Sequence, residues 1–313
     1  MKSKKKSTKI YFKLKIFIIF FFFIMFKKNK IIFIPNLKIF KKLSQNKSFH
    51  VSLVVPITVG DFFKIKDNFK YHKKFIDNIY NLIFIGNENI RNLIKLNKSF
   101  FEIPIKFISE KNLIDVNKVK NLIKNLNQRA VYRSGWYIQQ FLKMQYSYIC
   151  EDDYYLIWDS DTIPVKKVIL FNNDGKPYFH VMNKYFKSYF DTMKVVFPEL
   201  GKKFNFSFVS EHMLIKTEIM KNLIERIKKN KNLKGETWYE KVLFSIKKKE
   251  LPLLGFSEFE TFGTFAQIYY NKPYNIKNWK SLRNGKKNYN YKSLTSKDLE
   301  NISRIFDAIS FEK

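Results

Sequence analysis

Cysteine is nearly absent from this sequence of 313 residues, which contains one, and glycine and proline are scarce at 9 and 8. A single cysteine excludes an intramolecular disulfide framework and a zinc site built from several cysteines. The low glycine and proline contents exclude a collagen-like or other Gly/Pro-rich fibre. One thiol is compatible with either redox environment, so the cysteine count leaves the compartment open.

Arginine is also scarce: it supplies only 6 of the 59 basic residues, in a chain with 27 acidic residues and a formal charge of +32. An excess of this size raises the question of a polyanionic partner such as nucleic acid. Proteins that read bases depend on arginine for bidentate contacts. The abundant Lys, Asn, Ile, Phe and Tyr share A/T-rich codons, so base composition explains the charge. We expect no nucleic-acid partner.

Aromatic and apolar side chains are plentiful, with 34 phenylalanines and 45% apolar residues. This composition excludes a disordered chain. The length fits one large domain or two small ones, with enough chain to bury a core.

The N-terminal residues 1–48 hold 14 lysines and no acidic residue, around an apolar run from Ile16 to Phe26. That run spans about 16 Å as a helix, which is short of the ~30 Å hydrocarbon core. It extends to about residues 10–34 if Lys13 and Lys15 reach back to the interface. No small-residue cleavage site follows. We expect an uncleaved signal anchor, a single-pass transmembrane helix, with an interfacial basic anchor as the alternative.

The side of the membrane stays open. The larger basic cluster precedes the apolar run and favours a cytosolic N-terminus, but Lys27, Lys28 and Lys30 follow the run and weaken that preference.

Short apolar runs alternate with segments of helical spacing after residue 49. The runs typical of buried strands are 51–56, 81–85, 103–108, 154–158 and 178–182. Helical spacing covers residues 115–126, behind a capping Asp115, and residues 135–144. This alternation predicts an α/β domain with a mainly parallel sheet, whose ligands bind beyond the carboxyl ends of the strands.

The strongest chemical signal is the pair Asp159 and Asp161, which directly follows the run at 154–158. If the chain turns after Asp159, both carboxylates can face one hard cation such as Mg²⁺ or Mn²⁺, which also accepts substrate phosphates. Such a cation neutralises charge on a leaving group, so the pair predicts a nucleoside diphosphate site. An isolated Asp-x-Asp also occurs in surface turns, and the preceding strand favours the metal site.

Four further segments lie in a suggestive order: Arg133–Lys143, Phe171–Pro177, Ser210–Leu214 and Gly255–Gly263. Together with the aspartate pair they resemble a poorly characterised family of nucleotide-sugar glycosyltransferase-like proteins with the GT-A fold, over roughly residues 50–270. The resemblance implies a GT-A-like (Rossmann-like) mixed sheet flanked by helices. It also implies sugar transfer from a nucleotide-sugar donor, with Mn²⁺ or Mg²⁺ as cofactor and a glycan, lipid or protein as acceptor.

The resemblance also implies roles by position. Asp159 and Asp161 would hold the metal, with His212 as a third ligand or a phosphate contact, although a lone histidine is more often structural. The residues expected around the nucleotide donor are Pro56, Thr58, Asp61, Arg133, Trp136 and Gln140. Trp136 is equally well explained as a core residue.

An inverting transfer needs a carboxylate within hydrogen-bond reach of the acceptor hydroxyl. The candidates are Glu258 and Glu260, with Glu211 as a further acidic residue beside His212. His180 lies inside an apolar strand and is expected to be structural. Cys150 precedes an acidic cluster that would raise the pKa of its thiol, so we expect no nucleophilic role for it.

Two rival interpretations remain. The aspartate pair also resembles the first motif of haloacid-dehalogenase-like phosphatases, with Asp159 as nucleophile and Asp161 as acid/base. That motif usually opens its domain, whereas here about 100 residues of α/β pattern precede it, and it needs a later acidic metal pair, whereas no Asp-Asp or similarly spaced Asp pair follows Asp161. The non-enzymatic alternative is a membrane-tethered binding protein, whose segment from Tyr269 to Tyr291 would bind an anionic ligand. A solvated, lysine-rich loop is the simpler explanation of that segment.

The sequence therefore predicts a membrane-anchored, metal-dependent glycosyltransferase. Its expected parts are an anchor at 1–48, a catalytic domain at 49–270, and a basic, aromatic loop with a C-terminal helix at 271–313.

Overall fold

A computed structural model describes residues 50–312, which belong to one compact unit. The predicted anchor lies outside the described residues. No helix within residues 50–312 has the length and apolar character needed to cross a membrane.

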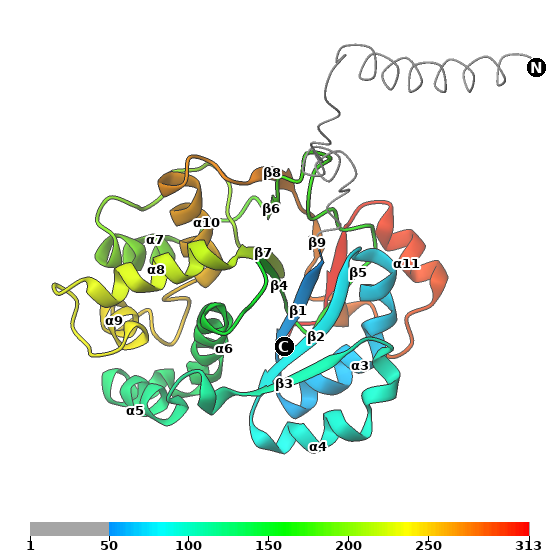
Figure 1. Ribbon diagram of the computed structural model, residues 1–313, viewed down its shortest axis with the longest axis horizontal. Coiled ribbons are helices and arrows are strands. Elements are labelled where there is room, and N and C mark those ends of the chain that lie inside the picture. Colours follow the sequence, from blue (N-terminus) through cyan, green and yellow to red (C-terminus); the bar gives the residue numbers. More distant parts are fainter. Residues whose placement is uncertain (1–49, 313) are drawn as a thin grey trace, which may run out of the picture. The chain divides into compact units, whose positions relative to one another are not determined.

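The core of the molecule is a five-stranded sheet in the order β3-β2-β1-β4-β7 (Figure 1). Its strands are β1 (Val51–Pro56), β2 (Ile79–Gly86), β3 (Ile105–Ser109), β4 (Tyr154–Trp158) and β7 (His212–Lys216). The first four are parallel, and β7 runs antiparallel to β4. The fold is therefore α/β with a mainly parallel central sheet, as the alternation of apolar runs predicts, and the antiparallel β7 makes the sheet mixed.

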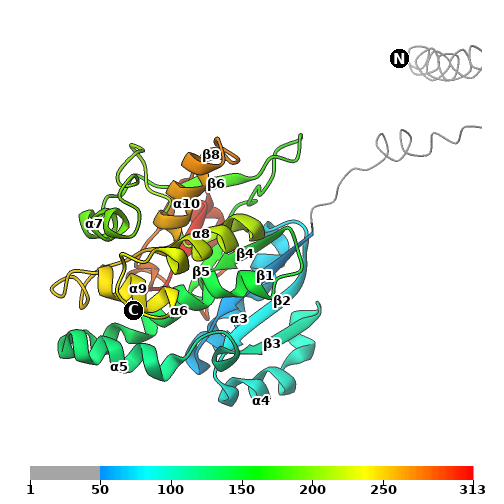
Figure 2. The same cartoon turned by 60° about the vertical axis from the view of Figure 1, so that its left-hand side comes forward.

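Helices cover both faces of this sheet, with α3 and α4 on one side and α5, α6, α8, α9 and α10 on the other (Figures 1 and 2). Successive residues of β1 divide between two apolar cores: Leu53 and Val55 face α3 and α4, and Val54 faces the other helices. Because neighbouring strand residues point to opposite faces, a strand covered on both sides must be apolar throughout. All six residues of β1 are buried.

The helices have the following bounds: α3 (Val59–Phe75), α4 (Glu88–Leu96), α5 (Val116–Leu126), α6 (Ser134–Gln145), α7 (Lys187–Val196), α8 (Thr217–Lys229), α9 (Trp238–Ser245), α10 (Glu258–Tyr269) and α11 (Ser296–Ser303). Helix α5 begins where predicted, since the Asp115 carboxylate accepts a hydrogen bond from the backbone N–H of Lys118 at 2.9 Å.

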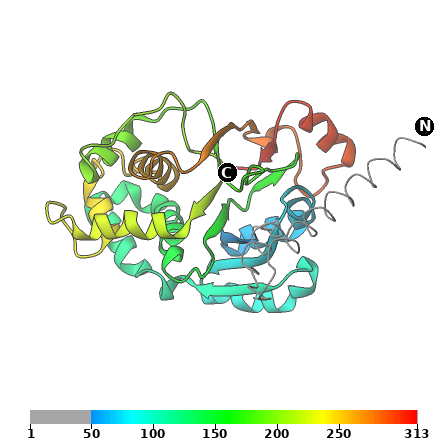
Figure 3. The ribbon, with the colours of Figure 1, turned by 45° about the horizontal axis from the view of Figure 1, so that its top comes forward.

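Two small sheets complete the fold: β5 (Thr162–Pro164), β10 (Ala308–Ser310) and β9 (Ser281–Leu282) form one, and β6 (Tyr178–Val181) and β8 (Asn275–Asn278) the other. The segment from Tyr269 to Tyr291 is therefore not a solvated loop, because β8 and β9 belong to sheets and Trp279 is buried. Strand β10 and helix α11 lie beside α3 (Figures 1 and 3), where Tyr71 packs against their apolar cluster.

Two glycines give a matched test of the packing around α10 and α6. A Cβ on Gly263 would overlap the ring of Phe208, whereas a Cβ on Gly135 would meet no atom within 4 Å. We expect Gly263→Ala to lower the free energy of unfolding by about 1–3 kcal/mol through overpacking. Gly135→Ala should raise it by about 0.5–1 kcal/mol by restricting the unfolded chain. Urea unfolding measures both, and equal effects would contradict the close packing of α10.

Candidate active site

A cleft of about 810 Å³ opens at the carboxyl ends of the parallel strands. The chain order reverses between β1 and β4, since β2 and β3 extend the sheet on one side and β4 and β7 on the other. Ligands of open α/β sheets bind at such a switch point. The residues that follow the four parallel strands and line the cleft are Thr58, Asn87, Glu110 and Asp159.

The aspartate pair follows β4 in a tight turn that faces this cleft. The backbone N–H of Thr162 donates to the Asp159 carbonyl at 3.1 Å, and the Trp158 indole N–H donates to the Thr162 carbonyl at 2.8 Å. Both Asp159 and Asp161 line the cleft. Burial, and then the neighbouring charge of Asp159, raises the pKa of Asp161 to about 6. Two carboxylates that repel each other are suited to a divalent cation, which prefers oxygen ligands.

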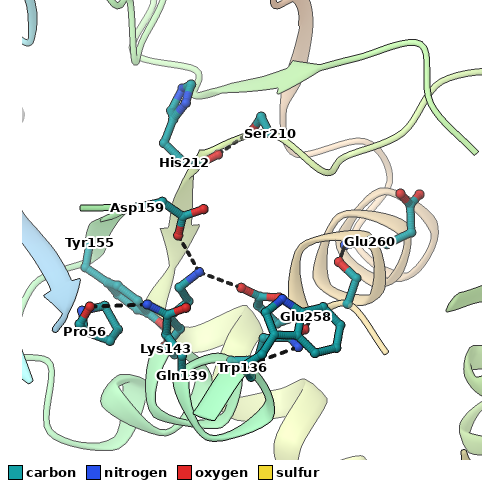
Figure 4. Close-up of polar contacts among 12 residues, drawn as sticks. Pro56, Trp136, Gln139, Lys143, Tyr155, Asp159, Ser210, His212, Glu258 and Glu260 are labelled. Carbon is teal, nitrogen blue, oxygen red and sulfur yellow. Dashed lines mark hydrogen bonds and ion pairs between the residues drawn. The ribbon is translucent and has the colours of Figure 1, made fainter. Parts of the chain in front are cut away.

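His212 does not join this pair. It lies opposite Trp158 on β7, and its imidazole stacks on that indole with ring centroids 4.6 Å apart. Its Nε2 lies 2.8 Å from Nδ1 of His180, and Figure 4 shows the ring pointing away from Asp159. Within residues 50–312 no group of three His, Cys, Asp or Glu side chains is arranged to hold a metal.

A buried lysine joins the two walls of the cleft (Figure 4). The Lys143 ammonium donates to Asp159 Oδ1 at 2.8 Å and to Glu258 Oε1 at 2.9 Å. Its side chain is only 5% exposed. Burial lowers the pKa of Lys143, but attraction by Asp159 and Glu258 outweighs burial and raises the pKa overall. The lysine therefore keeps its charge and holds the carboxylates of β4 and α10 together.

The three glutamates that are candidates for the general base lie in different environments in the structure. Glu258 lines the cleft, and its backbone N–H donates to the Gln140 side chain at 3.0 Å. Glu260 accepts a hydrogen bond from the Ser207 hydroxyl at 2.5 Å and does not line the cleft. Positions two apart on a helix point about 200° apart, so only one of the two glutamates can face the cleft.

Glu211 is buried behind the cleft rather than in it. Its carboxylate accepts from the Trp279 indole N–H at 2.9 Å and from the Arg283 guanidinium at 2.7 Å. It is therefore placed to position Arg283, which does line the cleft.

All six residues expected around the donor line the cleft: Pro56, Thr58, Asp61, Arg133, Trp136 and Gln140. Thr58 and Asp61 form the capping box of α3, which fixes their orientation. The Arg133 guanidinium lies 4.9 Å over the Trp136 ring and donates to the Leu253 carbonyl. Trp136 packs against the core and also lines the cleft.

The two residues expected to be structural lie in the core. His180 is buried with a lowered pKa of about 3, caused first by burial and then by the charge of Lys277. Burial is also the largest cause of the raised pKa of Cys150, and the Asp152 charge adds to it. The prediction from the acidic cluster is thus right in direction, but burial is the main reason.

Seven charged residues that line the cleft are not singled out by the sequence: Lys64, Glu110, Lys120, Lys143, Lys184, Arg283 and Glu312. Lys143 offers one signal, a charged residue beside Phe141 and Leu142 on the buried face of a predicted helix. Arg283 lies within the basic, aromatic segment from Tyr269 to Tyr291.

Sequence comparison assigns the chain to a family. Residues 48–293 match a family described as a family of unknown function, DUF6492. The chain belongs to this family. A search of proteins with curated descriptions gave no match.

The DUF6492 chain is also similar to solved glycosyltransferase structures at low identity. Mouse xyloside xylosyltransferase 1 is 11% identical, with 84% of this chain and 97% of that chain covered and a TM-score of 0.39. The galactosyltransferase LgtC is 10% identical, with 84% and 87% covered and a TM-score of 0.43. The glycosyltransferase GlyE of Streptococcus pneumoniae TIGR4 is 10% identical, with 84% of this chain and 55% of that chain covered and a TM-score of 0.39. The chain therefore spans about half the length of GlyE.

Proposed function

We propose that this DUF6492 protein is a glycosyltransferase that uses a nucleotide-sugar donor. One observation carries the proposal: the carboxylates of Asp159 and Asp161 face a cleft at the switch point of a parallel sheet. That is the place and the ligand set that a metal-bound nucleoside diphosphate requires.

The residues of the cleft have different roles in this proposal. Asp159 and Asp161 would hold Mn²⁺ or Mg²⁺, which when bound neutralises the charge of the leaving diphosphate. Pro56, Thr58 and Asp61 border the nucleoside, and Arg133 and Trp136 border the sugar. Gln140 fixes the start of α10 through the backbone of Glu258.

Glu258 is the base of this proposal. It is the only one of the three candidate glutamates that lines the cleft, and it would take the proton of the acceptor hydroxyl. Glu211 and Glu260 would act as structural carboxylates, through Arg283 and Ser207 respectively.

The rest of the proposal concerns the setting of the enzyme. The acceptor would be a glycan, lipid or protein, and the N-terminal residues 1–48 would anchor the enzyme to a membrane as a single-pass protein. Residues 49–270 would form the catalytic domain, and residues 271–313 would complete it by adding Arg283 and Glu312 to the cleft.

The alternatives are not favoured by the geometry. A haloacid-dehalogenase-like phosphatase needs further acidic metal ligands near Asp161. Besides Asp159, the acidic neighbours of Asp161 are Asp61, which caps α3, and Glu312, which pairs with Arg283. The nucleotide titration described below separates an enzyme from a tether with no donor site.

Nucleotide binding tests the proposal. Full-length protein in detergent would be titrated calorimetrically with UDP, GDP and CMP, with and without Mn²⁺. We expect Mn²⁺-dependent binding of one nucleotide and a loss of affinity of at least about 100-fold in the Asp159→Asn/Asp161→Asn double variant, which removes both metal ligands. Asp77→Asn is the control, because that carboxylate is 54% exposed and lies outside the cleft. Folded protein that binds none of the three nucleotides would overturn the proposal.

A further inference from the structure

Two cations lie on the cleft wall near Asp159. Arg283 follows β9, and Lys184 follows β6. Glu211, which is only 2% exposed, holds the Arg283 guanidinium through Nη1 at 2.7 Å. Since Trp279 holds Glu211 in turn, the guanidinium has a fixed orientation in the cleft.

Lys184 has no such partner. Within residues 50–312 its ammonium makes no hydrogen bond or ion pair, although the side chain is half-buried. Burial, and then the charge of Arg283, lowers the pKa of Lys184, and the carboxylates of Glu211 and Glu312 only partly offset that shift. Two like charges held close together at a partly buried site repel each other, and an anion between them would relieve that repulsion.

A carboxylate of the protein already occupies part of this site. The second side of the Arg283 guanidinium, Nη2, pairs with Glu312. Glu312 reaches the cleft because β10 pairs with β5, and the Phe311 N–H donates to the Asp161 carbonyl at 2.8 Å. The Glu312 side chain is 29% exposed, so it has room to turn toward solvent.

We propose that Lys184 and Arg283 form a diphosphate-binding site, and that Glu312 occupies it until a diphosphate displaces the carboxylate. A guanidinium binds phosphate oxygens in the same paired geometry that it uses for a carboxylate. The diphosphate would then lie between the two cations and the metal at Asp159 and Asp161. The inference rests on the proposed function only in taking a nucleotide sugar as the source of the diphosphate.

Inorganic pyrophosphate is the probe, titrated calorimetrically into full-length protein with and without Mg²⁺. We expect Glu312→Gln to bind pyrophosphate about tenfold more tightly, because a charged competitor is gone. Lys184→Met should bind about tenfold more weakly, and it breaks no ion pair that the fold needs. Lys187→Met, at a lysine that is 71% exposed, is the matched control and should bind like wild type. Thermal unfolding would verify that each variant is folded.

The outcomes separate the two proposals. Unchanged pyrophosphate affinity in both Glu312→Gln and Lys184→Met, or no binding by wild type and Glu312→Gln alike, would overturn the diphosphate site. The expected pattern with pyrophosphate, but no binding of UDP, GDP or CMP, would support the anion site and contradict the glycosyltransferase. Nucleotide binding that neither Glu312→Gln nor Lys184→Met changes would support the glycosyltransferase and contradict the diphosphate site.

Discussion

Replacing Lys143 with methionine is expected to lower the free energy of unfolding by about 3–5 kcal/mol, because the change leaves Glu258 as a buried charge without its partner. The glutamate side chain is 7% exposed, and the lysine ammonium is its only ion-pair partner among the described residues. Asp159 is 33% exposed, so water can solvate it after the change. Urea unfolding at neutral pH measures the effect.

Two further variants make this result specific. Lys143→Met/Glu258→Gln should recover a large part of the loss, since it removes the charge that the single variant leaves unpaired. Lys187→Met should change stability by no more than about 0.5 kcal/mol, because its ion pair with Asp191 is a surface i,i+4 pair. A single Lys143→Met variant as stable as wild type would show that the bridge between Asp159 and Glu258 does not hold the fold.

Glu260→Gln is expected to stabilise the protein by roughly 2.5 kcal/mol at pH 8.5 relative to its effect at pH 5. Burial raises the pKa of Glu260 from 4.5 to about 7. Between pH 4.5 and about pH 7, Glu260 therefore keeps its proton in the folded state and loses it in the unfolded state. The stability that Glu260 contributes is present at low pH and is lost as the pH rises to about 7. Glutamine cannot ionise, so the variant avoids that loss.

Unfolding in urea at pH 5 and pH 8.5, for wild type and variant, measures the difference. The Ser207 hydroxyl can also donate to the amide oxygen of glutamine, and its preference for the ionised glutamate is already included in the pKa of Glu260. Glu300→Gln is the control: this carboxylate is 70% exposed, and its effect should be nearly the same at both pH values. An equal effect of Glu260→Gln at the two pH values would mean that Glu260 is not buried in solution.

The central sheet was predictable because a strand that is buried on both faces has a continuous run of apolar residues in its sequence. Strands β1 and β4 match the predicted 51–56 and 154–158 residue for residue. Strand β7 was not predicted, since the polar residues His212 and Lys216 stand at its ends. Strands β5, β9 and β10 have two or three residues each, and only pairing with partners far away in the sequence defines them.

The site was predictable where a motif fixes it locally. Asp159 and Asp161 face the cleft because they follow a strand that ends at the switch point. The choice between Glu258 and Glu260 depends on the start of α10, which the spacing of the glutamates does not reveal. Lys184 is one lysine among many, and its importance comes from the nearby guanidinium of Arg283. Contacts of this kind arise only from tertiary structure.

The pairing of β10 with β5 also determines when the cleft can be completed during synthesis. All five strands of the central sheet leave the ribosome before residues 308–312, and a domain can begin to fold as it emerges. The turn that carries Asp161 receives its hydrogen bond from Phe311 only afterwards. A growing chain can thus hold a finished sheet beside an unfinished cleft wall.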